Sequence, residues 1–377
     1  MSAASYDLLI VGGGIVGAAC ALEAVRAGLK VCVCEGGVVG GGATAAGMGH
    51  LVVMDDSEAQ FALTSHSLAL WRELDISLPA GAEYHACGTL WVAADADEMA
   101  EVGRKRDFYL ERGVRVEVLD PQQLAEAEPQ LRPGLAGALL VPGDAVVYSP
   151  VVARLLVDRA LESGATLREG EMVCQVAPGE VILAGGERLV AAAVVNATGS
   201  EAPALTPGIP VQRRKGHLVI TDRHPSFVNH QLIELGYLKN AHSVSSDSVA
   251  FNVQPRRTGQ VLIGSSRQFG SDDLAIDQHI LHSMLERATS YLPELAGLVA
   301  IRVWTGFRAA TPDSLPLIGP VDMPTGRLWL ATGHEGLGIT TSLGTAELLV
   351  DQITGRESRI PFAPYLPTRS FSEAHLG

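Results

Sequence analysis

Cysteine is scarce in this sequence, and its spacing argues against two common kinds of site. Five cysteines occur in 377 residues, and no two of them form a C-x-x-C pair. No His, Cys and Asp spacing is typical of a metal site, so we expect no metal. An odd number of cysteines without a disulfide framework fits a reducing compartment and predicts a cytoplasmic protein. Cys32 and Cys34 alternate with valines and are predicted to be small buried residues of a strand.

Basic residues are outnumbered by acidic ones, and long apolar runs are absent. The 28 basic residues against 42 acidic ones give a formal net charge of −14, which argues against nucleic acid and an anionic membrane surface as partners. No stretch of 18 or more purely apolar residues occurs, so no membrane span is expected. The apolar N-terminal segment lacks a basic start and is interrupted by glycines, so it is not expected to be a signal peptide. The absence of a G-x-S-x-G motif argues against a hydrolase.

Glycine, in contrast, is abundant, and three glycines near the N-terminus form a G-x-G-x-x-G motif. Residues 6–11 are largely apolar and predict a buried strand. Gly12, Gly14 and Gly17 follow it, and the apolar-periodic residues 15–27 predict a helix. A strand, a glycine turn and a helix in this order are the start of a dinucleotide-binding unit.

The next strand completes this unit. Residues 30–34 predict a strand that leads to Glu35, about 20 residues past the glycines, where a ribose-binding carboxylate is expected. Gly12 allows the tight turn, Gly14 lets a pyrophosphate approach the backbone, and Gly17 lets the helix sit close to the strand. The helix N-terminus offers N–H groups and a positive dipole end to the phosphates. The charge of Glu35 would repel a 2′-phosphate.

A second glycine- and alanine-rich stretch, residues 36–49, comes directly after the ribose-binding strand. Such a composition is typical of a flexible linker or of a backbone that approaches something closely. A linker is unexpected at this position, so we predict a loop over a flat cofactor.

Three helices further along the chain have recognisable starts. Ser57 or its neighbour Asp56 caps a helix that is predicted to run to about residue 74. Ser149 is predicted to cap another, with Pro150 at its first position. The last of the three is predicted over 341–353, after a glycine-rich turn.

The chain is long enough for two domains, since single cores rarely grow beyond about 250–300 residues. Residues 210–308 contain β-rich runs and predict a separate antiparallel sheet. We therefore expect a discontinuous arrangement, with a ligand site at the junction. The dinucleotide-binding domain would comprise 1–81, 142–209 and 309–377, and the second domain 82–141 and 210–308.

Four segments together resemble the D-amino-acid oxidase and glycine/sarcosine oxidase family of FAD flavoproteins. They are residues 12–35, 40–48, 194–199 and 308–319, the last joined to 333–338. The resemblance implies an α/β fold with a Rossmann-type, glutathione-reductase-like FAD-binding domain. It also implies a discontinuous α+β substrate domain built on an antiparallel or mixed sheet, and FAD rather than NAD as the cofactor.

The resemblance further implies which residues would contact FAD. The Ala-Ala-Gly-Met loop would lie near the isoalloxazine ring, and Val173 would hold the adenine through its backbone. The glycine turn before the last helix would present N–H groups to the pyrimidine edge of the flavin. The complete set is Gly12, Gly14, Ile15, Val16, Gly17, Glu35, Gly42, Ala43, Thr44, Ala46, Gly47, Met48, Val173, Ala197, Thr198, Gly199, Gly336, Leu337, Gly338, Ile339 and Thr340.

Arg308 matches the family arginine that binds the substrate carboxylate, and its planar guanidinium suits that role. A surface ion pair is the alternative for this residue. His50 and Tyr237 are further active-site candidates, ahead of His217, although each also fits a structural role. Lys215 fits either a cation beside the flavin or a charge at a strand edge. The implied reaction moves a hydride from the substrate Cα to flavin N5 and gives an imine. The protein's contribution to catalysis would be mainly the orientation of the substrate and the electrostatics around the flavin.

Departures from the family pattern concern the flavin linkage and the substrate. Thr44 and Phe307 stand where members with covalently linked flavin carry histidine or cysteine, so noncovalent FAD is expected. Phe251 and Asn252 stand where several amino-acid oxidases carry an active-site tyrosine, which leaves the substrate open.

A narrower resemblance, to the FAD subunits of bacterial D-hydroxyproline dehydrogenases, rests on residues 47–56, 213–217 and 235–239. It implies a substrate like cis-4-hydroxy-D-proline, with companion electron-transfer subunits or a homo-oligomer as partners. Two alternatives stand beside it: a glycine- or sarcosine-type oxidase that uses oxygen, and a non-catalytic flavin-binding subunit of a larger complex. A flavin monooxygenase that uses NADPH is less expected, because no second nucleotide motif occurs.

Overall fold

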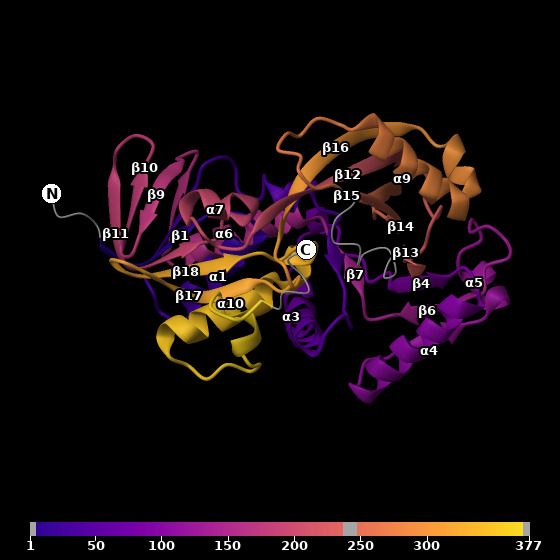
Figure 1. Cartoon of the computed structure of the whole chain (residues 1–377), viewed down its shortest axis with the longest axis horizontal. Helices are drawn as coiled ribbons and strands as arrows, with labels where there is room; N and C mark the ends of the chain where they lie inside the picture. Colours follow the sequence, from indigo (N-terminus) through magenta and orange to yellow (C-terminus); the bar gives the residue numbers. More distant parts are fainter. Residues whose placement is uncertain (1–4, 237–246, 372–377) are drawn as a thin grey trace.

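The computed structural model describes residues 5–236 and 247–371, and it contains two large sheets, one towards each end of the view in Figure 1. The first sheet has the order β17-β18-β11-β1-β2-β8, with β10 and β9 continuing antiparallel from β11. Its central strands run parallel, as a Rossmann-type unit requires. Its strands are β1 (Ser5–Val11), β2 (Val31–Glu35), β8 (Thr166–Glu169), β9 (Val173–Ala177), β10 (Glu180–Leu183), β11 (Arg188–Asn196), β17 (Leu317–Met323) and β18 (Gly326–Thr332).

Helices cover this sheet and explain why its strands are apolar throughout. Leu8, Leu9 and Ile10 of β1 are fully buried, because side chains on both faces of a covered parallel sheet are removed from water. Cys32 and Cys34 of β2 are buried as predicted. Helix α1 contacts α6 and α10, and α10 also contacts α3. These helices are α1 (Ile15–Arg26), α3 (Glu58–Asp75), α6 (Ser149–Glu162) and α10 (Gly338–Thr354).

The second sheet has the order β16-β12-β15-β14-β13-β4-β6-β5 and is mixed, since β13 runs parallel to β4 while the other neighbours are antiparallel. Helix α9 packs on β14 and β15, and α4 and α5 pack near β4 and β6. The strands are β4 (Thr89–Ala93), β5 (Glu117–Leu119), β6 (Gly137–Val141), β12 (Gln212–Arg223), β13 (Gln231–Glu234), β14 (Ser248–Pro255), β15 (Gln260–Arg267) and β16 (Ala300–Ala310). The helices are α4 (Ala96–Glu111), α5 (Pro121–Ala127) and α9 (Gln278–Tyr291).

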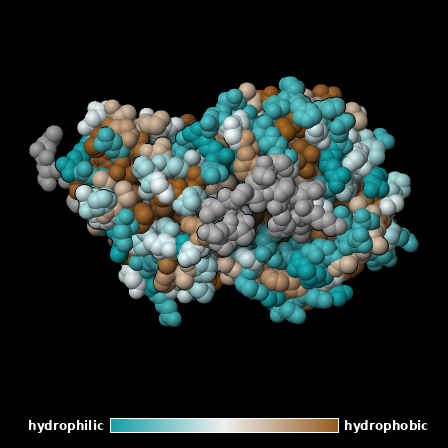
Figure 2. Space-filling view, viewed as in Figure 1, coloured by the Kyte–Doolittle hydropathy of each residue, from teal (hydrophilic) through white to brown (hydrophobic). Residues whose placement is uncertain are grey.

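Short elements complete the described part of the chain. They are α2 (Ala43–Ala46), α7 (Ala202–Leu205), β3 (His50–Leu51), β7 (Ala145–Val146), and the 3₁₀ turns Ala80–Ala82, Gly199–Glu201, Pro293–Gly297 and Ala363–Tyr365. The first sheet takes its strands from the segments predicted for the dinucleotide domain, and the second sheet takes its strands from the other segments, except that β16 runs on to Ala310. The division into two domains at those boundaries remains our proposal. Polar side chains cover much of both lobes on the face shown in Figure 2.

One predicted helix cap is wrong. Helix α6 begins at Ser149, so Tyr148 occupies the N-cap position and makes no side-chain cap bond. The Ser149 hydroxyl instead donates to the carbonyl of Thr44, at 2.9 Å. The serine therefore ties α6 to the loop that contains α2. The cap prediction for α3 is confirmed, because the Ser57 side chain accepts a bond from the N–H of Gln60.

Candidate active site

The first glycine turn is closely packed against the end of β11. Gly12 has a φ of +107°, and a Cβ built on it would lie 2.6 Å from the carbonyl oxygen of Ala197. A Cβ on Gly17 would lie 1.9 Å from the carbonyl oxygen of Gly12. Side chains are thus excluded at both positions, and the strand-to-helix turn exposes backbone where a pyrophosphate is expected. Thr198 continues from Ala197, with its hydroxyl bonded to Asn196.

Glu35 is anchored at the end of β2 beside this turn. One carboxylate oxygen accepts from the N–H of Gly13 and the other from the N–H of Gly37, each at 2.7 Å. Each oxygen keeps further lone-pair capacity for a hydroxyl donor. A Cβ on Gly36 would lie 3.3 Å from the Cα of Met172, so the chain leading into Val173 passes beside the same strand end.

The 42–49 loop contains one turn of helix, α2, and packs under the second sheet. The N–H of Ile15 donates to the Thr44 hydroxyl at 3.0 Å, which joins the loop to the start of α1. The side-chain amide of Gln254 donates to the carbonyl of Met48 at 2.6 Å. A Cβ on Gly306 would lie 2.4 Å from the Cβ of Ala46, so β16 crosses directly over α2.

The glycine turn before α10 closes against this loop. Helix α10 begins at Gly338, three residues before its predicted start, so the turn is shorter than expected. A Cβ on Gly47 would lie 3.0 Å from Cδ1 of Ile339. The Thr340 hydroxyl donates to the carbonyl of His50 at 2.8 Å. Two segments that lie almost 300 residues apart in the sequence are thereby brought together.

Arg308 extends from β16 across the backbone of β12. A Cβ on Gly216 would lie 2.4 Å from Nη1 of Arg308, and one on Gly336 would lie 3.8 Å from its Nε. The guanidinium also donates to the carbonyl of Ser266 at 2.9 Å. The Arg308 guanidinium therefore lies between these two glycines. Its role as a carboxylate anchor stays a prediction from the sequence.

His50 lies just beyond the loop, with its ring held on both sides. Nδ1 is 2.5 Å from Oε1 of Gln231, and Nε2 is 3.5 Å from Nδ2 of Asn252. Burial and, to a smaller extent, the nearby charge of Arg308 lower the pKa of His50 to about 4, although the hydrogen bond with Gln231 acts in the opposite direction. The imidazole is therefore neutral at ordinary pH.

Two candidates are bonded to other groups of the chain, and a third is not described. The amine of Lys215 bonds to Asp273 at 2.9 Å and to the hydroxyl of Ser271, both in the segment that follows β15. The ring of His217 bonds to the Ser266 hydroxyl and accepts from the N–H of Asp277. Tyr237 lies outside the described residues.

The sequence reasoning missed Gln231, Gly216 and Gln254. Each becomes part of the site only through strand pairing or a contact between distant segments, and no local pattern marks it. Asn252 was noted in the sequence. The structure directs it towards His50, while its neighbour Phe251 stacks on Tyr291 with ring centroids 4.4 Å apart.

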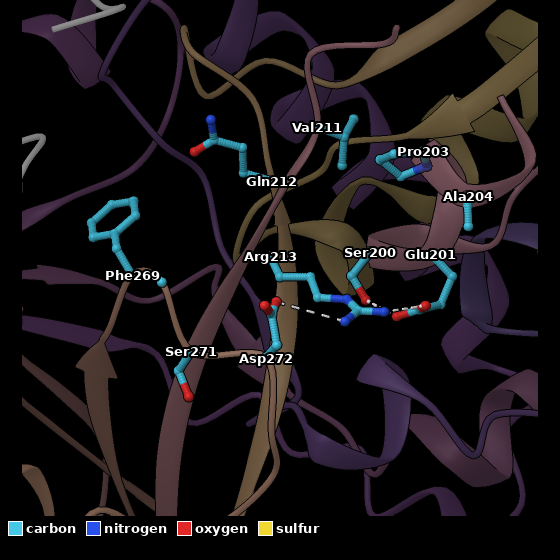
Figure 3. A pocket seen from close by; sticks show the side chains of 11 residues that line it. Ser200, Glu201, Pro203, Ala204, Val211, Gln212, Arg213, Phe269, Ser271 and Asp272 are labelled. Atoms are coloured by element: carbon cyan, nitrogen blue, oxygen red, sulfur yellow. Dashed lines mark hydrogen bonds and ion pairs between the residues drawn. The ribbon is translucent and has the colours of Figure 1, made fainter. Parts of the chain in front are cut away.

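A separate cavity of about 400 Å³ lies beyond Gly199. In Figure 3 the Arg213 side chain lies between Glu201 and Asp272, with which it forms ion pairs. None of the residues predicted for the cofactor or for catalysis lines this cavity. Its lining is Ser200, Glu201, Pro203, Ala204, Val211, Gln212, Arg213, Phe269, Gly270, Ser271 and Asp272.

Membrane-spanning helices and metal-binding clusters are both absent from residues 5–236 and 247–371. In these ranges no helix is both long and apolar enough to span a bilayer. The same ranges contain no cluster of three or more His, Cys, Asp or Glu side chains able to hold a metal ion.

Comparisons with known proteins agree with the geometry. The family model described as FAD dependent oxidoreductase matches residues 7–352. A glycine oxidase of Pseudomonas aeruginosa is 30% identical, over 96% of this chain and 99% of its own length. A D-amino acid dehydrogenase of Xanthobacter autotrophicus is 29% identical over 76% of this chain and 66% of its own length. The crystal structure of glycine oxidase from Geobacillus kaustophilus superposes with a TM-score of 0.87 at 28% identity, covering 98% of this chain and 100% of that one. The chain therefore belongs to the FAD dependent oxidoreductase family.

Proposed function

We propose that this FAD-dependent oxidoreductase oxidises the C–N bond of an amino acid, with cis-4-hydroxy-D-proline as its substrate. The observation that carries the proposal is the place of Arg308, between Gly216 and the flavin-side turn at Gly336 and close to His50. A cation in that position pairs with a substrate carboxylate. The two relatives named for glycine and D-amino acids support an amino acid as the substrate class.

The described residues fit FAD. The turn at Gly12 and Gly17 leaves no room for side chains and offers backbone to a pyrophosphate. We propose that Glu35 holds the adenosine ribose and Val173 the adenine, while the loops 42–48 and 336–340 hold the flavin. Because Thr44 and Phe307 replace the residues that would form a covalent link, we propose noncovalent binding. When bound, FAD supplies the group that accepts a hydride from the substrate carbon.

The chain's own contribution to the reaction is orientation. Arg308 anchors the carboxylate, which leaves the amino group towards His50 and Asn252. The neutral ring of His50 accepts a hydrogen bond from that amino group, and the apolar cluster of Met48, Leu218 and Leu262 keeps water from the neighbouring surface. The product is an imine, which hydrolyses or leaves.

Anaerobic reduction of the bound flavin tests the proposal. The purified holoenzyme is mixed with D-proline, hydroxy-D-prolines, sarcosine or glycine, and loss of flavin absorbance is followed. Fastest reduction by cis-4-hydroxy-D-proline is expected. If glycine or sarcosine reduces the flavin fastest, that amino acid and not cis-4-hydroxy-D-proline is the substrate. If none of the amino acids reduces the flavin, the chain is a non-catalytic flavin-binding subunit.

The electron acceptor needs its own measurement. We propose that electrons pass to a companion subunit or a quinone, which a dye replaces in the assay. Turnover with cis-4-hydroxy-D-proline and dye in the absence of oxygen is expected, with little hydrogen peroxide when air replaces the dye. Peroxide production at the rate of dye reduction would identify an oxidase.

A further inference from the structure

A buried glutamine on the second sheet faces the active site. Gln231 lies on β13 with 1% of its surface exposed, and its register partner on β4 is Thr89. Its backbone N–H donates to the carbonyl of Gly88 at 3.0 Å, which fixes the start of the strand beside β4. The proposed reaction gives this residue no direct role.

The hydrogen bonds of Gln231 have a defined direction. Its Nε2 donates to the hydroxyl of Thr89 at 3.0 Å, so its oxygen Oε1 is directed towards Nδ1 of His50 at 2.5 Å. An amide oxygen only accepts hydrogen bonds, so Nδ1 of His50 carries the hydrogen. In a neutral imidazole the other nitrogen, Nε2, then has a lone pair.

The surroundings of His50 Nε2 provide a second acceptor. Nδ2 of Asn252 donates a long hydrogen bond of 3.5 Å to this nitrogen, and Oδ1 of Asn252 is buried without a hydrogen-bond partner among the described residues. Asn252 is 9% exposed. A lone pair held only by this long bond and an unpaired amide oxygen, both close to the charge of Arg308, match a ligand that carries an N–H donor next to a carboxylate.

We propose that Gln231 is a positioning residue that holds His50 in its Nδ1–H form, so that the Nε2 lone pair, beside Asn252 Oδ1, faces the substrate amino group and accepts a hydrogen bond from it. The inference rests on the proposed function for the identity of that donor. The orientation of the ring rests only on the chain's own contacts, since Thr89 orients the glutamine and the glutamine orients the histidine. In this proposal Gln231 acts only through His50.

The ring can be examined without a substrate. Nitrogen-15 NMR of imidazole-labelled holoenzyme distinguishes a protonated from an unprotonated ring nitrogen, and the His50→Gln protein identifies the His50 signals. In the wild-type protein we expect hydrogen on Nδ1 and none on Nε2 of His50. Hydrogen on Nε2 would overturn the proposal, whatever the activity of the enzyme.

Two substitutions separate positioning from packing. Gln231→Leu keeps the approximate size of the side chain but accepts no hydrogen bond, so His50 should populate both tautomers. KM for the amino acid should then rise about tenfold, the effect expected for the loss of one hydrogen bond, while kcat should change much less. Gln231→Glu keeps an acceptor at Nδ1 and should restore the wild-type pattern. Gln260→Leu, at the start of β15, which β14 separates from β13, is the matched control and should change neither the NMR pattern nor KM.

The outcomes separate this inference from the proposed function. An unchanged tautomer in Gln231→Leu would overturn the positioning role, as would an unchanged KM. If Gln231→Leu does not fold, the NMR patterns of the wild type and of Gln231→Glu still show whether Gln231 sets the tautomer of His50. If no amino acid reduces the flavin while the tautomer is as expected, the proposed function fails and the part of the inference that names the amino group fails with it. The positioning of His50 by Gln231 would then still stand.

Discussion

At the scale of single residues, Arg308 should decide whether a carboxylate substrate binds productively. Arg308→Met removes the charge and keeps much of the side-chain volume. We expect kcat/KM for the amino acid to fall at least about 100-fold, because a desolvated carboxylate would lose its charged partner. Stopped-flow reduction of the flavin measures the loss. Arg327→Met, a surface arginine on β18, is the control, and similar kinetics in both variants would exclude the anchoring role.

Gly216 should matter for the same reason, although it makes no bond to the substrate. A Cβ at this position would meet the end of the Arg308 side chain, which can swing aside at little cost to the fold. Gly216→Ala is therefore expected to leave the melting temperature almost unchanged while KM rises about tenfold or more. Gly103→Ala, on α4 where a Cβ meets nothing within 4 Å, should leave KM unchanged. An unaltered KM in Gly216→Ala would mean that Arg308 tolerates displacement.

Asp144 should limit stability at neutral and alkaline pH. Burial raises its pKa to about 7, above the ordinary value of 3.8, so the folded state holds its proton more tightly than the unfolded state does. Below about pH 4 the carboxyl is protonated in both states. Between pH 4 and 7 the unfolded chain ionises while the folded protein keeps the proton, so stability falls as pH rises through this range. Asp144→Asn should therefore be more stable than the wild type at pH 8, by on the order of 4 kcal/mol.

Urea unfolding at pH 4 and pH 8 checks this prediction. The advantage of Asp144→Asn should shrink as pH falls and vanish near pH 4, where the wild-type carboxyl is protonated. Asp107→Asn, an exposed position on α4, serves as the control. An advantage that does not vary with pH would show that ionisation of Asp144 is not its cause.

At the scale of elements, the β1–α1–β2 unit should control cofactor retention rather than substrate choice. The Glu35 carboxylate bonds to the backbone of the glycine turn and of the following loop. Glu35→Ala should weaken FAD binding about tenfold or more while the ranking of amino-acid substrates stays the same. Flavin absorbance after dialysis measures retention, with Glu162→Ala at the exposed end of α6 as the control. Equal FAD content in Glu35→Ala and the wild type would contradict the role of Glu35 as ribose holder.

Some of these elements could be predicted from the sequence alone, and others could not. The strand, turn and helix of residues 5–26 were predictable, because apolar periodicity and glycine spacing are local signals. Arg308 was singled out by its resemblance to a family motif, and its role stays a prediction. The pairings of Gln231 with Thr89 and of β12 with β16 were not, because register between distant strands depends on the whole sheet. The misassigned cap at Ser149 has the same origin, since its hydroxyl bonds to a residue 105 positions away.

At the scale of the whole molecule, buried histidines should make the protein sensitive to acid. Burial lowers the pKa of His334 to about 3 and that of His50 to about 4, so both are neutral in the folded state. In the unfolded chain they take up protons below about pH 6.5. Their contribution to stability is complete above that pH and is lost as pH falls towards 3–4, with a slope of about 1.4 kcal/mol per pH unit for each histidine.

One substitution tests whether His334 contributes to the loss of stability at acidic pH. His334→Gln keeps a polar group near Thr345, to which the ring bonds at 2.9 Å, but takes up no proton. The slope of unfolding free energy between pH 4.5 and 6 should decrease by about 1.4 kcal/mol per pH unit. His282→Gln, at an exposed position on α9, should leave the slope unchanged. An unchanged slope in His334→Gln would exclude His334 as a source of acid sensitivity.

The order in which the chain supplies its two sheets has a consequence for its synthesis. β4, β5 and β6 emerge long before β12 to β16, and the first sheet waits for β17 and β18 near the C-terminal end. The second sheet can be completed only once Ala310 has been synthesised, and the first only once Thr332 has been, since domains fold as units when their strands are available. The turn at Gly336, which we propose holds the flavin, is made later still. A ribosome-bound nascent chain that stops before residue 332 should therefore fail to capture flavin, and the cofactor would join the protein only after nearly all of it has been translated.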